Sequence, residues 1–157
     1  MRAAKNKWTQ VVVAAGLLWM ANALAATVHG AQAQPPAGGS SVWSGVYSEE
    51  QAKRGEAAAG KLCSSCHGPD LTGGEAGPSL VGLEFLGNWN TLSIGDLFDR
   101  VQTTMPADSP GSLSPQQTVD IEAYVFKLNK MPAGATELPT DQAALKQITI
   151  ESQPPAK

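Results

Sequence analysis

Apolar residues recur every three or four positions in two segments of the chain, which is the spacing of one face of an α-helix. Residues 93–104, SIGDLFDRVQTT, begin with a serine that suits a helix N-cap. Residues 114–130, SPQQTVDIEAYVFKLNK, begin with Ser-Pro, which suits the N-cap and the first helical position. Each segment is therefore predicted to form an amphipathic helix with one face in the core. The apolar faces are Ile94, Leu97, Phe98 and Val101 in the first segment and Val119, Ile121, Tyr124, Val125 and Leu128 in the second.

A further helix is predicted at residues 48–63, SEEQAKRGEAAAGKLC, from its start signal and its composition. Ser48 suits the N-cap, and Glu49 and Glu50 lie in the first turn, where the helix dipole favours negative charge. Helix-forming residues continue from there to Cys63, which gives a helix of about four turns. No segment shows the alternation typical of a strand, so the pattern as a whole predicts an all-α protein.

The amino end has the features of a signal peptide. Residues 1–33 have a basic start, an apolar run that begins at Val11, and small-residue cleavage sites after Ala25 and Ala33. The run is short and rich in alanine for a membrane span, and an uncleaved anchor that tethers the protein to the membrane is the alternative. In either case we expect the folded part to be exported.

The rest of the chain divides into three segments. Residues 34–41, QPPAGGSS, are predicted to be a flexible lead, and residues 132–157, which contain four prolines, are predicted to be a mostly extended C-terminal tail. One domain of residues 42–131 remains between them. So small a core buries little apolar surface, and a cofactor or a covalent staple is expected to supplement it.

The charge of the mature chain excludes some classes of partner. Removal of the signal peptide leaves eight Lys and Arg against fourteen Asp and Glu, a formal charge of −6. The sequence also has no cluster of basic residues. Both features argue against nucleic acid and against anionic membrane surfaces as partners.

Both cysteines of the chain lie in the stretch CSSCH, residues 63–67. A disulfide between them would close a very small loop and stabilise little, and a thioredoxin-like redox pair would need strands that the sequence does not predict. A zinc site would need four ligands, whereas the mature chain offers Cys63, Cys66 and His67. Two thiols at this spacing, followed by histidine, form the attachment motif of a c-type haem. We therefore predict one covalently bound haem c.

The other face of a haem iron needs a second ligand or an open position. The mature chain offers two soft candidates, Met105 and Met131. Met105 precedes Pro106, which favours a loop at the end of the preceding helix, whereas Met131 at the end of the last helix is more typical of a packing residue. Met105 is therefore the predicted ligand. The carbonyl group of Pro78, in GPSLVG, is a candidate acceptor for the second ring nitrogen of His67, and an ordinary turn is the alternative.

The segments CSSCHG, GPSLVG, TTMP and DIEAYVFKL together resemble a class I cytochrome c over about residues 42–131. More narrowly, SVWSGVYSEEQAKRG, CHGPDLTGGE, FLGNWNTLSIGDLFDR and TTMPADSPGSLS are similar to the single-haem modules associated with quinoprotein alcohol dehydrogenases. The resemblance implies a small fold of three to five helices wrapped around one covalently bound haem.

The same resemblance implies roles for individual residues around the haem. Trp89 would donate its indole N–H to a haem propionate, or else be a plain buried aromatic residue. Pro78 would accept a hydrogen bond from His67, and Leu80 would pack against the ring. The implied thioether attachment points are Cys63 and Cys66, and the implied axial ligands of the iron are His67 and Met105.

The resemblance also implies that the first and last helices cross closely. Gly55 matches the small residue at this crossing, with Tyr124 as its aromatic counterpart. One position departs from the family, because Ala59 stands where the first helix usually carries an aromatic residue. Trp43 or Tyr47 is expected to fill that space.

An iron with both axial positions filled has no room for a substrate, so the expected function is electron carriage and not catalysis. The family likeness implies a periplasmic location, a dehydrogenase with PQQ as its cofactor as the electron donor, and a cytochrome or terminal oxidase as the acceptor. Two alternatives stay open. Without ligation by Met105, a five-coordinate haem would bind a gas or a peroxide. Alternatively, the protein is a fixed subunit of a dehydrogenase complex, with the proline-rich tail as a docking strap instead of a disordered end.

Overall fold

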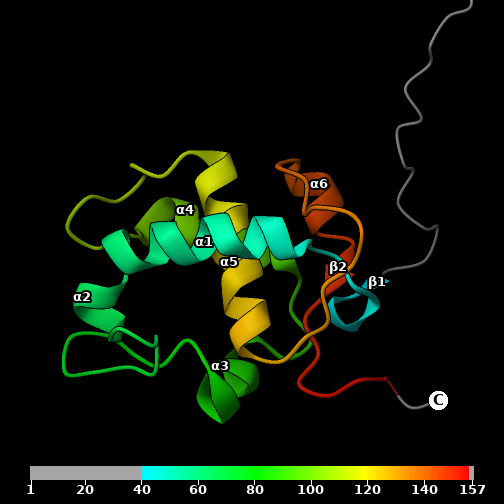
Figure 1. The fold of residues 1–157 in the computed structure, drawn as a ribbon, viewed down its shortest axis with the longest axis horizontal. Coiled ribbons are helices and arrows are strands. Elements are labelled where there is room, and N and C mark those ends of the chain that lie inside the picture. The colour runs from blue at the N-terminus through cyan, green and yellow to red at the C-terminus, as the bar shows by residue number, and fades with distance from the viewer. Residues whose placement is uncertain (1–39, 156–157) are drawn as a thin grey trace, which may run out of the picture. The chain divides into compact units, whose positions relative to one another are not determined.

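The computed structural model describes residues 40–155, and helices account for most of its regular structure (Figure 1). The all-α fold predicted from the sequence is confirmed. The described residues form six α-helices, not three to five, because α2 and α6 are single turns of four residues. The predicted signal peptide and most of the predicted lead lie outside the described residues. The elements are β1 (Ser40–Ser41), the 3-10 helix η1 (Val42–Ser44), α1 (Glu49–Leu62), α2 (Ser64–His67), α3 (Gly82–Trp89), α4 (Ile94–Thr104), α5 (Pro115–Leu128), α6 (Gln142–Leu145) and β2 (Ile148–Thr149).

The three helices predicted from the sequence begin where their caps predict. The hydroxyl group of Ser48 accepts a hydrogen bond from the backbone N–H of Gln51 at the start of α1. Ser93 and Ser114 each form a capping box with the residue three positions further on, at the starts of α4 and α5. These contacts satisfy backbone N–H groups that have no partner within the helix, which is why the caps locate the helix starts.

Helix α1 lies across α5, and their backbones approach very closely at Gly55 (Figure 1). A Cβ atom on Gly55 would lie 1.8 Å from the backbone oxygen of Asp120 in α5. No side chain fits in that space, so the sequence needs glycine at this position. The close crossing that the family resemblance implies is therefore confirmed, and its expected aromatic counterpart, Tyr124, packs half-buried against the core.

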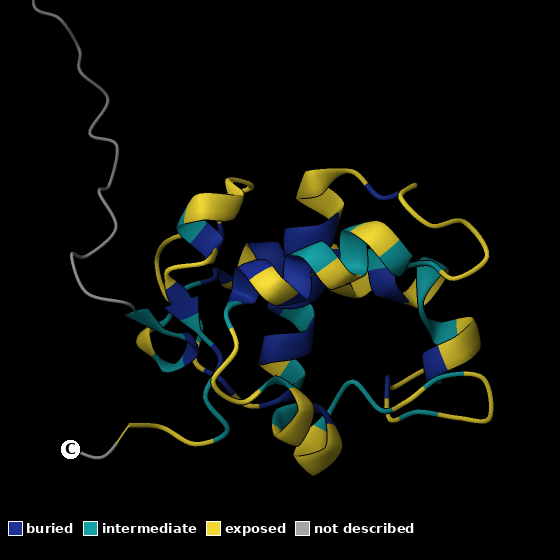
Figure 2. Ribbon diagram, turned by 180° about the vertical axis from the view of Figure 1, so that it is seen from behind, coloured by how far each residue is buried: buried dark blue, intermediate teal, exposed yellow. Residues whose placement is uncertain are grey.

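The buried part of α5 is wider than the predicted apolar stripe. Phe126, which the stripe leaves out, is fully buried, whereas Tyr124 and Leu128 are only half-buried. The reason is that both α1 and α4 pack against α5. Figure 2 shows this as dark-blue ribbon where the helices face one another.

The segment after α5 belongs to the domain, which corrects the expectation of a tail beyond residue 131. Leu138, Leu145, Ile148 and Ile150 are buried and join the same hydrophobic core as α1, α4 and α5. Strand β2 pairs in parallel with β1, so the end of the predicted lead is ordered as well. The prolines of this segment therefore accompany a packed structure, which is neither a disordered end nor a strap free to dock elsewhere.

Two side chains of α1 fasten the C-terminal segment close to the helix crossing. The side-chain amide of Gln51 donates to the carbonyl oxygen of Leu138 at 3.1 Å and accepts from its N–H at 2.8 Å. Arg54 forms ion pairs with Asp120 of α5 at 2.9 Å and with Glu137 at 2.7 Å. The guanidinium group of Arg54 lowers the pKa of Glu137. Because these residues adjoin the crossing, one region of α1 holds both α5 and the C-terminal segment.

Trp43 and Tyr47 also hold the C-terminal segment, which corrects the expectation that one of them fills the space beside Ala59. The indole N–H of Trp43 donates to the carbonyl oxygen of Glu151 at 2.9 Å, and the hydroxyl group of Tyr47 donates to that of Met131 at 2.7 Å. Burial, with a smaller contribution from the charge of Glu49, raises the pKa of Tyr47 to about 12. The two aromatic residues precede α1, whereas Ala59 lies in its last turns, so the length of the helix separates them.

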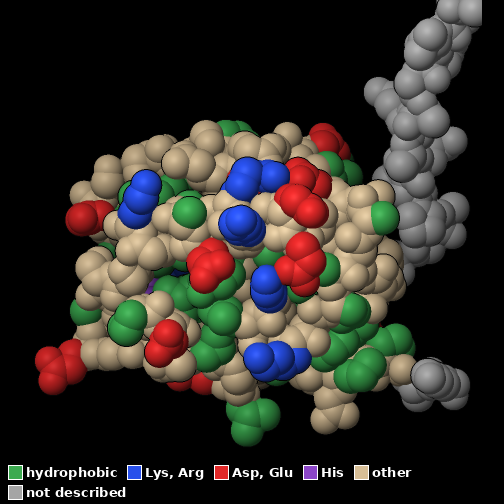
Figure 3. Space-filling model, viewed as in Figure 1, with side chains coloured by type: hydrophobic (Ala, Val, Ile, Leu, Met, Phe, Trp, Pro, Cys, Tyr) green, Lys and Arg blue, Asp and Glu red, His purple; other side chains and the backbone are tan. Residues whose placement is uncertain are grey.

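The surface over α1 and α5 mixes charges of both signs. Figure 3 shows Lys and Arg side chains interspersed with Asp and Glu on this face. One ion pair across the two helices joins Lys127 to Glu49 at 2.7 Å. On this face the basic side chains therefore lie among acidic ones.

We predict that Gly55→Ala lowers the free energy of unfolding by about 3 kcal/mol or more, because its methyl group would meet backbone that cannot move aside like a flexible side chain. Denaturant unfolding of the holoprotein measures the effect. The matched control is Gly60→Ala in the same helix, where a Cβ atom meets nothing within 4 Å. The free energy of unfolding of that variant is expected to rise by about 0.5–1 kcal/mol, because alanine has a higher helix propensity than glycine. Equal effects of the two substitutions would contradict the close crossing.

Candidate functional site

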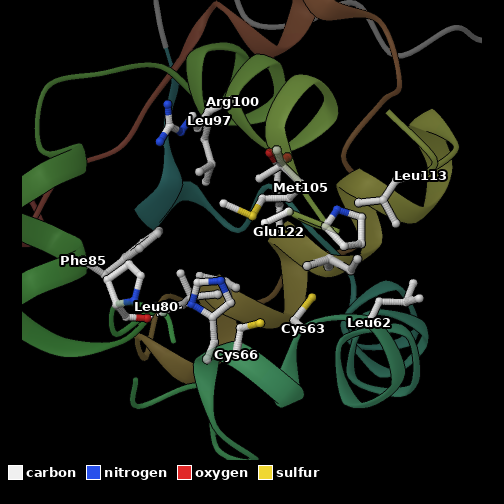
Figure 4. A pocket seen from close by; sticks show the side chains of 18 of the residues that line it. Leu62, Cys63, Cys66, Leu80, Phe85, Leu97, Arg100, Met105, Leu113 and Glu122 are labelled. Carbon is white, nitrogen blue, oxygen red and sulfur yellow. Dashed lines mark hydrogen bonds between the residues drawn. The ribbon is translucent and has the colours of Figure 1, made fainter. Parts of the chain in front are cut away.

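A cavity of about 570 Å³ is bounded by α2, α3, α4, α5 and the loop that follows α4 (Figure 4). Its walls are mostly apolar, so water in the cavity would leave much apolar surface in contact with solvent. Such walls favour a large apolar ligand with a few polar groups. The apolar lining includes Leu80, Phe85, Leu97, Leu113, Ile121 and Val125.

The CSSCH motif forms a single turn at one side of this cavity. Helix α1 ends at Leu62, and the backbone N–H of His67 then donates to the carbonyl oxygen of Cys63 at 2.9 Å, which closes the turn α2. Both thiols and the imidazole ring thus line the same cavity. The thiols are free, with Cys63 half-buried and Cys66 exposed. Burial, and to a smaller extent the neighbouring Cys66, raises the pKa of Cys63.

His67 is held in one orientation by the loop that follows it. Its ring atom Nδ1 lies 2.7 Å from the carbonyl oxygen of Pro78, which is the pair predicted from the sequence. Because a carbonyl oxygen can only accept, Nδ1 carries a proton, and in the neutral imidazole the lone pair is then on Nε2. Gly77 leaves room for this arrangement, since a Cβ atom there would lie 3.0 Å from Nδ1.

Asn129 binds the end of the loop that carries Pro78, a role that was not predicted from the sequence. Its side-chain amide donates to the carbonyl oxygen of Leu80 at 3.0 Å, and its side-chain oxygen accepts from the N–H of Gly82 at 2.9 Å. Asn129 is also the C-cap of α5. The loop that carries Pro78 and Leu80 is therefore tied to the last long helix, a long-range contact that no local pattern predicts.

The structure separates the two candidate methionines. Met105 lines the cavity (Figure 4). Met131 is buried and is not among the residues that line the cavity. Met105 is the C-cap of α4 with φ −121° and ψ 149°, so Pro106 does follow a residue that has left the helix. The loop after it is held by Gln102, whose side-chain amide donates to the carbonyl oxygen of Leu113 at 2.9 Å.

The remaining predicted residues also lie at the cavity. Leu80 and Trp89 line it, and the ring of Trp89 is 6.4 Å from that of Phe85, centroid to centroid, at a tilt of 37°. Trp89 is half-buried. Its proposed contact with a haem propionate stays a prediction.

One cavity residue is buried although its position in the sequence did not predict it. Glu122 of α5 is 1% exposed, and neither of its carboxyl oxygens has a hydrogen-bond partner within the described residues. Burial raises its pKa well above the ordinary value of 4.5, so the folded protein favours the neutral acid. A glutamate within a helix gives no sequence signal of burial, because most such residues face solvent.

The residues at the cavity fit a c-type haem better than the other ligands considered. Two thiols at the attachment spacing, an imidazole with Nε2 free and a thioether sulfur share apolar walls. Within residues 40–155, no group of three or more His, Cys, Asp and Glu gathers so that it could hold a metal ion.

Comparison with protein families finds a match within this part of the chain. Residues 50–125 match the family described as cytochrome C oxidase, cbb3-type, subunit III. The matched stretch begins in α1, ends in α5 and includes both cysteines, His67 and Met105. It is slightly less than half of the chain. Together with the helical fold, the match supports a class I c-type cytochrome domain, and a domain of this class implies haem c as its cofactor.

One solved structure is similar to the chain. It is described as the crystal structure of the sulfane dehydrogenase SoxCD from Paracoccus pantotrophus, and it is 20% identical with a TM-score of 0.45. The similarity covers 68% of this chain and 61% of that one, so it spans less than two thirds of that protein chain. No curated protein matches the sequence significantly.

Within the described residues, no helix is both long enough and apolar enough to cross a membrane.

We predict that Glu122→Gln changes the pH dependence of stability. Wild-type Glu122 keeps its proton in the folded state at pH values where the unfolded chain has lost it, so its contribution to stability falls as pH rises above about 4.5. Glutamine has no such dependence. The free energy of unfolding of the variant, measured in denaturant from about pH 4 to pH 7, should therefore rise relative to wild type as pH increases. A difference that stays constant over this range would contradict the buried neutral carboxyl group.

Proposed function

We propose that the protein is a periplasmic single-haem c-type cytochrome that carries electrons and is not itself an enzyme. One observation carries this proposal: the fold brings Met105 to the same apolar cavity as Cys63, Cys66 and His67, which lie together in the CSSCH motif. The family match over residues 50–125 supports the class of c-type cytochromes. The signal-peptide pattern of residues 1–33 supports export.

In this proposal each residue of the motif has a distinct task. The thiols of Cys63 and Cys66 hold one haem through thioether bonds. The hydrogen bond from His67 to Pro78 fixes the imidazole tautomer and keeps Nε2 available as a ligand. Met105 supplies a sulfur ligand, which favours a raised reduction potential. Bound haem supplies reversible one-electron chemistry at its iron.

The choice of a carrier over a catalyst follows from the two residues that would hold the haem iron, His67 and Met105. With His67 and Met105 both bound, no coordination position is left for a substrate. That Met105 lines the cavity favours this reading over a five-coordinate haem that binds a gas or a peroxide.

The proposed partners are other redox proteins of the same compartment. We propose a periplasmic dehydrogenase, with PQQ as its cofactor, as the electron donor, and a cytochrome or terminal oxidase as the acceptor. The negative charge of the mature chain and the mixed charges over α1 and α5 suit transient protein contacts better than nucleic acid. Whether the protein moves freely or stays bound to a dehydrogenase can be tested by copurification through a salt wash.

Exposure of the reduced holoprotein to carbon monoxide tests the axial ligands. We predict no change in the haem absorption bands of the wild type, because both positions are filled. Met105→Leu removes the sulfur with little change in volume and should bind carbon monoxide promptly. Met131→Leu is the matched control, since Met131 lies outside the cavity lining, and it should behave as wild type. Prompt binding by the wild type, or none by Met105→Leu, would contradict the assignment of Met105.

A further inference from the structure

No hydrogen bond or ion pair of the described residues accounts for the burial of the Glu122 carboxyl group. It lies in the wall of the cavity (Figure 4). The apolar lining residues Ile121 and Val125 are on the same helix. Its side chain is buried, and both carboxyl oxygens lack a partner within the described residues. A buried polar group of this kind costs stability, so a fold that keeps it at a functional cavity suggests a functional role.

No charged side chain neutralises Glu122 from the elements packed around it. On the cavity side the titratable groups are Arg100 of α4, Asp108 in the loop after α4, His67 and the two thiols of α2, and none hydrogen-bonds to Glu122. Of the cations on α1 and α5, Arg54 is engaged by Asp120 and Glu137, and Lys127 is engaged by Glu49. Burial alone accounts for the raised pKa of Glu122. A change of charge inside the cavity would therefore act on this carboxyl group without a competing ion pair.

We propose that Glu122 couples electron transfer at this site to the uptake and release of one proton. This inference rests on the proposed haem function. When a redox partner delivers one electron to the cavity, the added negative charge favours the neutral acid, and a carboxylate form of Glu122 takes one proton from solvent. When the electron leaves to the acceptor, the carboxyl group releases that proton. One electron and one proton enter together and leave together, so the net charge of the cavity stays constant.

The sign of the coupling follows from this balance. The pKa of Glu122 is higher in the reduced protein than in the oxidised protein, because the extra electron disfavours a second negative charge nearby. Between these two pKa values the reduction potential falls as pH rises. The largest possible slope is about 59 mV per pH unit, which is a tenfold change in proton concentration for a one-electron couple. A purely structural role for Glu122 would produce no such slope.

Spectroelectrochemical titration of the holoprotein at a series of pH values tests the proposal. The reduction potential of the wild type should fall with rising pH. Glu122→Gln keeps the size of the side chain but cannot ionise, so the part of this pH dependence that comes from Glu122 should be absent from the variant. Glu84→Gln, which removes an exposed carboxyl group on α3, is the matched control and should keep the wild-type slope. Glu122→Leu provides a second variant without an ionisable group if the glutamine variant folds poorly.

Infrared difference spectra between the reduced and oxidised states provide a second readout. The band of a protonated carboxyl group should grow on reduction of the wild type and be absent from the Glu122→Gln difference spectrum. The same pH slope in wild type and in both Glu122 variants, or a wild-type potential independent of pH, would overturn the proposal while leaving the carrier function intact. A purified protein without covalently bound haem would instead overturn the proposed function itself.

Discussion

The contact on which the rest of the structure depends is the approach of α1 to α5 at Gly55. The backbone oxygen of Asp120 occupies the space where any other residue would place its Cβ atom, so the two helices can approach this closely only with glycine there. Helix α1 leads directly into the turn that carries Cys63 and His67, and α5 supplies a wall of the cavity. The crossing therefore sets the distance between the attachment motif and the opposite wall.

The same short region of α1 also holds the segment that enlarges the small core. Gln51 and Arg54 bind the segment after α5, and that segment adds five buried apolar side chains to the domain: Met131, Leu138, Leu145, Ile148 and Ile150. Asp120 takes part twice, through its backbone at the crossing and through its side chain with Arg54. For a domain of this size, the C-terminal segment supplies core on the side away from the cavity, and the proposed haem would supply further buried surface inside it.

Local signals in the sequence predicted a large part of the fold and the site. Serine caps located the starts of α1, α4 and α5, and CSSCH with the Met-Pro step located the residues that meet at the cavity. Features that depend on contacts distant in sequence were missed. Leu138, Leu145, Ile148 and Ile150 have no regular period, so the prolines around them suggested a tail, and α3 is too short for its pattern to stand out. Asn129 and Glu122 are polar residues whose burial only the packed structure reveals.

The account centres on a haem held covalently by Cys63 and Cys66 in the cavity. Mass spectrometry of the denatured holoprotein tests this claim most directly. We expect the chain to retain the mass of one haem after denaturation and acid extraction, and to lose it in the double variant Cys63→Ser/Cys66→Ser. A wild-type chain that has the mass of the polypeptide alone after the same treatment would contradict the account.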